Sequence, residues 1–258
     1  MQAKASKATP TMSTTSSVPA GTATATATAP PAMRAKAVPR KATMKRWRLA
    51  VVDDHPLVRR GIRDALAEES GFDVVGEAHD ASGAMQIVRE HHPDLITVDI
   101  SLGRGSGLEL IKQMRSQWPD LGIIVVSVHD EELYAERSLR AGANGYLRKS
   151  EPLDRLVGAV RTVLAGGTAL TPDMTQRLVD QAVRGGSSDA SGVRSLSDRE
   201  LEVFEMIGSG LGTRKIANRL CISIKTVETH RENIKRKLGI DNAPELARFA
   251  VAWVENPA

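Results

Sequence analysis

The chain has 258 residues, of which 41% are hydrophobic, and its formal net charge at pH 7 is +4. This length predicts two domains. The apolar runs are shorter than the ~18 residues that a membrane helix needs, and the first residues lack the apolar core of a secretory signal. We therefore expect no membrane association. Because Cys221 is the single cysteine, no disulfide can form within the chain, and we expect a cytoplasmic protein.

The charges are unevenly distributed along the chain. Residues 1–48 contain nine Lys and Arg and no acid, whereas residues 49–166 contain 13 Lys and Arg against 19 Asp and Glu. Residues 212–237 contain eight basic residues against two acidic ones. An acidic module followed by one with a basic patch indicates cation chemistry in the first and polyanion binding in the second.

Residues 1–45 are rich in Ala, Thr, Ser and Pro and include an alternating Thr-Ala repeat at 22–28. Such a segment cannot bury enough apolar surface to offset the entropy cost of ordering it. We predict a disordered basic tail over residues 1–45.

Short runs rich in β-branched residues alternate with helical patterns from Leu49 onward. The runs predict strands, and the patterns between them predict helices, at these positions: strands 49–52, 73–75, 95–98, 123–126 and 146–147, and helices 56–69, 82–90, 108–117, 131–141 and 153–165. This alternation predicts an α/β fold over residues 46–166, a doubly wound five-stranded parallel sheet of the flavodoxin-like kind. The common strand order, 2-1-3-4-5, places the first and third strands side by side.

Polar side chains follow these runs at the ends of the strands. Asp53 and Asp54 follow the first run and Asp99 follows the third. The carboxyl ends of parallel strands meet in one crevice, and three acids there would repel one another unless a hard cation such as Mg²⁺ lay between them. Ser127 and Lys149 follow the fourth and fifth runs, adding a hydroxyl and a cation suited to a phosphoryl group. We predict that Asp99 accepts a phosphoryl group with the help of Mg²⁺.

Two glycines, Gly166 and Gly167, end the last helix of this module. The following segment contains one weak helical pattern, at 172–183, and ends in a stretch rich in Gly and Ser. Its composition predicts a flexible linker over residues 167–193.

The last module, residues 194–258, predicts a small all-α fold of four helices. Ser197 and Glu200 form a capping-box pattern, and Leu196 can pack on Leu201 beside it. Two short helices separated by a tight turn, with many basic residues in the second, are typical of a helix-turn-helix. Cys221 lies in that turn, where we expect it to be a small core residue.

Three segments carry a family resemblance, and they read VVDDHPLVR at 51–59, AGANGYLRK at 141–149 and KTVETHR at 225–231. Residues 49–166 resemble the receiver domain of response regulators. Residues 194–256 resemble the four-helix DNA-binding domain of the LuxR/NarL (FixJ-like) family. The resemblance implies a two-component transcription regulator and not an enzyme.

The resemblance also implies roles for individual residues of the first module. A sensor histidine kinase would phosphorylate Asp99. Asp54, Asp99 and the backbone carbonyl of Ser101 would hold Mg²⁺, and Asp53 would act through water. Lys149 would pair with the phosphoryl group, Ser127 would turn toward it, and Tyr146 would swing inward.

In the last module the resemblance implies binding to double-stranded promoter DNA. The residues expected at the major groove or its edge are Lys225, Thr226, Glu228, Thr229 and Glu232, and the candidates for phosphate contact are His230, Arg231, Lys235 and Arg236. Arg214 and Lys215 in the preceding helix are also expected to bind DNA. A carboxylate near DNA is costly unless it accepts a hydrogen bond from a base amine. Glu228 and Glu232 would therefore either read cytosine or pair with Arg231 or Lys235.

Phosphorylation is expected to promote formation of a homodimer through the last helix, which we expect to expose Leu246, Ala250 and Trp253. Two alternatives stay open. The chain could be an orphan regulator that binds DNA regardless of phosphorylation. It could also be a Mg²⁺-dependent phosphohydrolase, although Ser101 stands where such enzymes have the second acid of an Asp-x-Asp pair.

Overall fold

The computed structural model describes residues 46–103, 105–129, 131–183 and 192–255. The predicted tail, residues 1–45, lies outside these ranges. Among the helices of the described residues, none combines the length and the hydrophobicity that crossing a bilayer requires.

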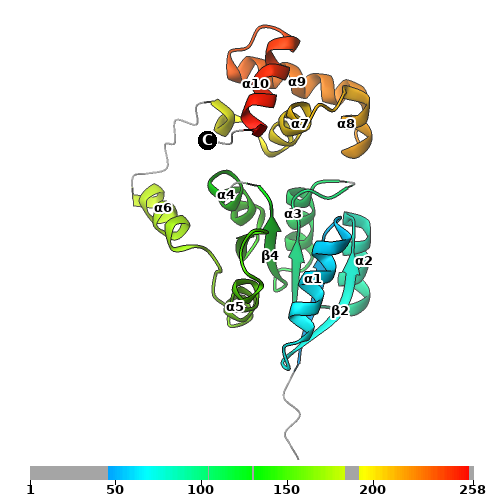
Figure 1. Cartoon of the computed structure of the whole chain (residues 1–258), viewed down its shortest axis with the longest axis vertical. Coiled ribbons are helices and arrows are strands. Elements are labelled where there is room, and N and C mark those ends of the chain that lie inside the picture. The colour runs from blue at the N-terminus through cyan, green and yellow to red at the C-terminus, as the bar shows by residue number, and fades with distance from the viewer. Residues whose placement is uncertain (1–45, 104, 130, 184–191, 256–258) are drawn as a thin grey trace, which may run out of the picture. The chain divides into compact units, whose positions relative to one another are not determined.

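The first module contains a five-stranded sheet with all neighbouring strands parallel, which confirms the predicted fold (Figure 1). The strands are β1 (Trp47–Val52), β2 (Phe72–Ala78), β3 (Leu95–Val98), β4 (Gly122–Ser127) and β5 (Gly145–Arg148), in the order β2-β1-β3-β4-β5. The central strands are buried on both faces, as parallel sheets require. In the register of β1 and β3, Val52 faces Val98, so the residues that follow these two strands are neighbours.

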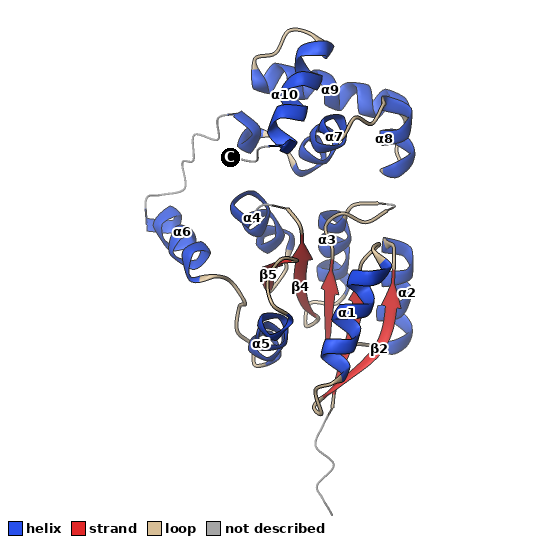
Figure 2. Ribbon diagram, in the orientation of Figure 1, coloured by secondary structure: helices blue, strands red, loops and turns tan. Residues whose placement is uncertain are grey.

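Helices cover both faces of this sheet (Figure 2). One face is covered by α1 (Pro56–Ala67) and α5 (Leu153–Leu164), and the other by α2 (Ala81–His91), α3 (Gly107–Gln117) and α4 (Glu131–Ala141). The sequence explains where several of them begin, because the side chains of Asp80 and Ser106 accept backbone N–H groups at the starts of α2 and α3. At the start of α3 the chain folds back so closely that a Cβ on Gly107 would lie 2.4 Å from the carbonyl oxygen of Asp99.

The segment after α5 contains the helix expected at 172–183, but its first residues pair with the sheet, which the expectation of a flexible linker did not include. Ala169 forms a parallel bridge with Gly145 at the edge of the sheet, and α6 (Pro172–Val183) contacts α4. The cause is apolar burial, because the side chains of Ala169 and Met174 are 8% and 5% exposed. The first part of the linker is therefore attached to the first module.

The last module consists of a short 3₁₀ turn, η1 (Gly192–Ser195), followed by α7 (Asp198–Gly208), α8 (Thr213–Arg219), α9 (Ile224–Leu238) and α10 (Ala243–Glu255). The capping box of Ser197 and Glu200 is present at the start of α7. Gly208 allows α10 to approach α7 closely, since a Cβ there would lie 2.4 Å from the carbonyl oxygen of Ala250.

Two expectations for this module are wrong. Leu246 and Ala250 are fully buried, and Trp253 is partly buried with its ring 5.6 Å from that of Phe204. These positions form the apolar stripe that packs α10 into its own domain, so they cannot be an exposed dimer surface. Cys221 is exposed and has a left-handed φ of 54° in the turn between α8 and α9.

Candidate functional site

Asp53, Asp99 and Lys149 meet at the carboxyl ends of the strands. Asp53 follows β1 and Asp99 follows β3, and each is 1% exposed. The Nζ atom of Lys149, which follows β5, lies 2.7 Å from Oδ2 of Asp53 and 2.6 Å from Oδ2 of Asp99. Three residues that are far apart in the sequence thus form a buried group of two carboxylates and one ammonium.

Asp54 and His55 extend this group toward solvent. The Nδ1 atom of His55 lies 2.7 Å from Oδ1 of Asp54, and the backbone amide of His55 donates to Oδ1 of Asp53 over 2.8 Å. One ligand atom from each of Asp53, Asp54, His55 and Asp99 lies within 4.8 Å of all the others. His55 was missed from the sequence, although its place directly after the two acids was a signal that could have drawn attention to it.

The donor set of this pocket fits a hard divalent cation. Within the described part of the chain, Oδ2 of Asp53 and Oδ1 of Asp54 are buried atoms without a hydrogen-bond partner, and the Lys149 ammonium and the His55 ring lie beside them. Buried carboxylate oxygens of this kind are costly unless positive charge compensates them. Carboxylate groups are also the ligands that Mg²⁺ prefers in proteins. The residues that the structure places here are therefore compatible with the predicted Mg²⁺.

Burial and ion pairing act in opposite directions on the charged groups. Burial raises the pKa of Asp99, and the hydrogen bond from Lys149 lowers it only in part, so it stays above its ordinary value. Burial lowers the pKa of Lys149, but Asp53 and Asp99 raise it by more, so the amine remains charged at neutral pH. The pocket accordingly holds more negative charge than Lys149 alone stabilises.

Ser101 lies in the loop after Asp99. Its amide donates to Oδ1 of Asp99 over 3.2 Å, and its hydroxyl lies 2.5 Å from Nε2 of His129. His129 is a second residue that the sequence did not point to, and it joins the loops that follow β3 and β4.

Ser127 and Tyr146 both contact the connection between β4 and α4. Ser127 is fully buried, and its hydroxyl accepts the backbone N–H of His129 over 3.2 Å. Tyr146 is also fully buried, and its hydroxyl donates to the carbonyl oxygen of His129 over 2.9 Å. The two residues expected to rearrange therefore hold the same backbone segment, one at each polar group of His129.

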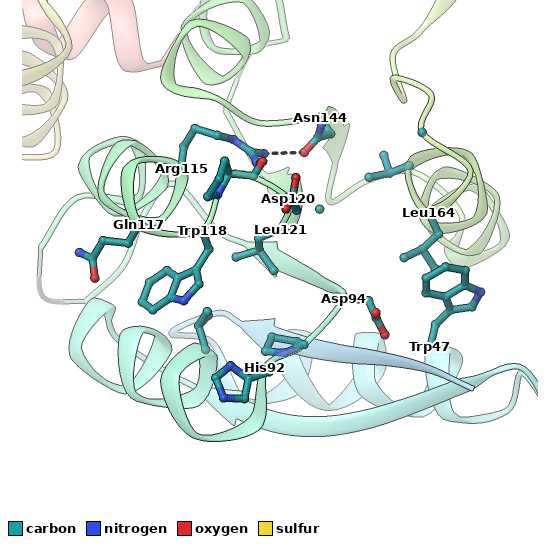
Figure 3. Close-up of a pocket in the computed structure, with 16 residues that line it drawn as sticks. Trp47, His92, Asp94, Arg115, Gln117, Trp118, Asp120, Leu121, Asn144 and Leu164 are labelled. Carbon is teal, nitrogen blue, oxygen red and sulfur yellow. Dashed lines mark hydrogen bonds between the residues drawn. The ribbon is translucent and has the colours of Figure 1, made fainter. Parts of the chain in front are cut away.

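A cavity of about 500 Å³ lies at the opposite end of the sheet, where the strands begin (Figure 3). Trp47 and Trp118 are among its lining residues, and Arg115 donates to Oδ1 of Asn144 over 2.8 Å beside it. Arg115 also donates to the carbonyl oxygen of Gly142. These bonds fix the loop before β5, and the cavity is separate from the acidic pocket.

The second predicted site lies on α8 and α9. Most of the residues predicted to contact DNA are exposed, namely Arg214, Lys215, Lys225, Thr226, Glu228, Thr229, Glu232 and Arg236. The other three, His230, Arg231 and Lys235, are partly buried. Glu232 pairs with Lys235 at 3.0 Å, so of the two alternatives left open for Glu232 the ion pair is present.

The polar side chains of α9 are partly engaged in holding their own helix. The Thr226 hydroxyl lies 2.8 Å from that of Ser223, the residue that caps α9, and the Thr229 hydroxyl donates to the carbonyl oxygen of Lys225. Burial lowers the pKa of His230, so this imidazole is neutral at pH 7. A contact from His230 to a phosphate would therefore be a hydrogen bond without a charge.

Comparison with known proteins identifies two families along the chain. Residues 49–161 match the response regulator receiver domain, and residues 194–250 match the bacterial regulatory proteins of the luxR family. The oxygen regulatory protein NreC of Staphylococcus carnosus (strain TM300) is 38% identical over 209 residues, which cover 79% of this chain and 96% of that protein. NreC of Staphylococcus epidermidis is 36% identical over 210 residues, with the same two coverages.

Solved structures of RcsB are also similar to this chain. RcsB from Salmonella enterica serovar Typhimurium, bound to promoter rprA in the presence of the phosphomimetic BeF₃⁻, is 26% identical with a TM-score of 0.60, covering 80% of this chain and 99% of that one. A second RcsB structure, from Salmonella typhimurium, is 27% identical with a TM-score of 0.62, covering 81% and 98%.

Proposed function

This chain belongs to the LuxR/NarL family of two-component response regulators, which bind DNA under the control of phosphorylation, and we propose that Asp99 is its phosphoacceptor. The observation that carries the proposal is the buried group of Asp53, Asp99 and Lys149 at the carboxyl ends of the strands. In this proposal residues 46–166 form the receiver domain and residues 194–258 the DNA-binding domain.

Phosphorylation would begin with a sensor histidine kinase as the donor. A carboxylate oxygen of Asp99 attacks phosphorus, the bond from phosphorus to the donor nitrogen breaks, and an acyl phosphate remains on Asp99. Mg²⁺ held by Asp54, Asp99 and the carbonyl of Ser101, with Asp53 acting through water, would neutralise charge on the phosphoryl oxygens.

The chain's own residues would then respond to the new group. The Lys149 ammonium is near enough to Asp99 to pair with a phosphoryl oxygen. Ser127 would release the N–H of His129 and turn so that its hydroxyl donates to a phosphoryl oxygen. Tyr146 already lies inward, and it would shift together with the carbonyl of His129, to which its hydroxyl donates. Movement of the β4–α4 connection is therefore the first consequence that we propose.

The DNA-binding partner of this proposal is a promoter duplex, as the family and the promoter-bound RcsB structure support. The exposed Arg214 and Lys215 of α8 and Arg236 of α9 would contact phosphates, while Lys225, Glu228 and Thr229 would reach base edges. A homodimer would read two half-sites roughly 10 base pairs apart. Its surface would include the exposed Phe249, Val251 and Val254 of α10, in place of the buried positions expected earlier.

The test is phosphorylation of the full chain by acetyl phosphate with Mg²⁺, followed by separation of the phosphorylated form on a phosphate-binding gel. We expect Asp99→Asn to abolish the hydroxylamine-sensitive phosphate. The matched control is Asp94→Asn, which changes an acid that accepts the amide of Arg48 at the other end of the sheet. Hydroxylamine-sensitive phosphate that persists on Asp99→Asn would exclude this site. Equal DNA affinity with and without acetyl phosphate would favour the orphan regulator instead.

A further inference from the structure

The edge strand β5 has a backbone partner from the segment that follows α5. The amide of Tyr146 donates to the carbonyl oxygen of Ala169 over 2.9 Å, and the amide of Ala169 donates to the carbonyl oxygen of Asn144 over 2.9 Å. Gly145 and Ala169 form a parallel bridge between these bonds. The segment therefore pairs with the outer edge of the sheet as a further strand would.

The approach of this segment to β5 is close. A Cβ added to Gly145 would lie 2.8 Å from the carbonyl oxygen of Ala169 and 2.9 Å from its Cβ. Ala169 itself is only 8% exposed and packs among the apolar residues under α5. The contact between β5 and this segment therefore requires glycine at position 145.

The same segment is also fixed to the start of α4. The hydroxyl of Thr171 donates to Oε1 of Glu131 over 2.6 Å and accepts the amide of Met174 over 3.2 Å. Glu131 is the first residue of α4, and Met174 is a buried residue of α6. Residues 168–171, which we call the tether, thus connect β5, α4 and α6.

Tyr146 is held from two directions by these contacts. Its side-chain hydroxyl bonds the carbonyl of His129 in the β4–α4 connection, and its backbone amide bonds Ala169 in the tether. A hydrogen bond of normal length weakens steeply when its partners move apart or tilt. A change in the position of Tyr146 must therefore be followed by the tether or must break a buried backbone bond.

We propose that the tether positions Tyr146 in the receiver and carries its rearrangement directly into α6 and the interdomain linker. This inference rests on the proposed function, because it takes Tyr146 as a residue that responds to phosphorylation of Asp99. It adds a route from that residue toward the DNA-binding domain, which begins at the backbone hydrogen bond to Ala169 and continues along the chain through the tether and α6. The carbonyl oxygen of Ala169 acts through Tyr146 and does not touch the phosphoryl group.

The test compares Gly145→Ala, which pushes the tether from β5, with Gly158→Ala as the matched control. Gly158 lies on α5, and a Cβ there would meet no atom of the described residues within 4 Å. A second variant, Thr171→Val, removes the bond to Glu131 from the other end of the tether without touching β5. Each full-length protein is titrated with beryllofluoride and Mg²⁺, and its affinity for a DNA duplex selected with the wild-type protein is measured with and without beryllofluoride.

We expect the beryllofluoride affinity of Gly145→Ala to stay within about twofold of wild type, because the acidic pocket is intact. The ratio of DNA affinities with and without beryllofluoride should fall at least fivefold in Gly145→Ala, at least twofold in Thr171→Val, and remain unchanged in Gly158→Ala. On activation, the hydrogen-exchange rates of the Tyr146 and Ala169 amides should change together in wild type. In Gly145→Ala they should change independently of each other.

An unchanged affinity ratio in both tether variants, with faster exchange at Ala169, would overturn the inference, since the contact would then be structural only. If Gly145→Ala does not fold, the result with Thr171→Val decides. A wild-type protein that binds beryllofluoride with no change in DNA affinity would contradict the proposed function itself, and the inference with it.

Discussion

Replacing Lys149 with Met should reveal how much the charge balance of the pocket contributes to stability. The substitution removes an ammonium that lies within 2.7 Å of two carboxylates, each 1% exposed, from a side chain that is itself 8% exposed. Methionine keeps a long, unbranched side chain. The change therefore acts mainly on charge.

The expected loss in the free energy of unfolding follows from that burial. Breaking a buried ion pair by removal of one partner costs about 3–5 kcal/mol, because an uncompensated charge remains. Part of this cost is avoided if one carboxylate takes up a proton, and the pKa of Asp99 already lies above its ordinary value. Without Lys149, which lowers it, that pKa should rise further.

The raised pKa of Asp99 sets the sign of the pH dependence. A carboxyl group whose pKa is higher in the folded than in the unfolded state binds more protons when folded, so the free energy of unfolding falls as pH rises through the folded pKa. The free energy of unfolding that Lys149→Met loses relative to wild type should therefore be larger at about pH 8 than at about pH 5. Mg²⁺ at 100 times its dissociation constant should restore about 2.7 kcal/mol.

The assay is urea unfolding followed by far-UV circular dichroism, at both pH values and with and without Mg²⁺. Arg155→Met is the control, because Arg155 is 51% exposed and pairs with Glu151 one turn earlier on the surface, where a salt bridge contributes about 0.5 kcal/mol. A Lys149→Met protein as stable as wild type, with the same pH dependence and the same response to Mg²⁺, would refute the reasoning.

Three further predictions concern the DNA-binding domain. Glu200→Gln should lower the free energy of unfolding by about 1–3 kcal/mol in urea titrations, because Glu200 is buried 2.6 Å from Lys237. Burial raises the pKa of Glu200, but Lys237 and Ser197 lower it by more, so the pKa lies below its ordinary value. Wild type should therefore lose this stabilisation as pH falls below about 4.5. A Glu200→Gln protein with the same acid transition as wild type would contradict this. Phe249→Ser should weaken the activated dimer at least tenfold in sedimentation velocity without unfolding the domain, and an unchanged dimer would exclude this face. Arg236→Gln should reduce the slope of log K against log salt by about 1, and an unchanged slope would mean that Arg236 contacts no phosphate.

The strand order and the acidic pocket could be predicted because each buried strand is a continuous apolar run that ends at a polar residue. Strand β2 is the exception, since it extends from Phe72 to Ala78, well beyond the expected residues 73–75. It is an edge strand with several exposed or half-exposed positions, and Gly76 and Glu77 interrupt its apolar pattern. Edge strands carry a weaker hydrophobic signal than buried ones.

A sequence pattern shows on which face of a helix or strand a residue lies, but it does not show what covers that face. The errors and omissions share this physical origin. Leu246 and Ala250 lie on the apolar side of α10, and the sequence could not tell whether their own domain or a second copy would bury them. His55 and His129 were missed because their contacts depend on side-chain rotation and loop path. Ala169 reaches β5 through a backbone pairing that no side-chain pattern predicts.

The strand order arranges these groups in a line across the sheet. Asp53 follows β1 and Asp99 follows the neighbouring β3, while Ser127 ends β4 and Tyr146 lies in the edge strand β5, with Ala169 paired beyond it. Charge is therefore gathered near the middle of the sheet, and each successive strand toward β5 carries a group that can respond to it. Strand β2 lies on the other side of β1, so changes there should alter stability without altering the response to phosphorylation. In the proposed mechanism, a linker attached at β5 lies at the edge of the sheet that this response reaches last.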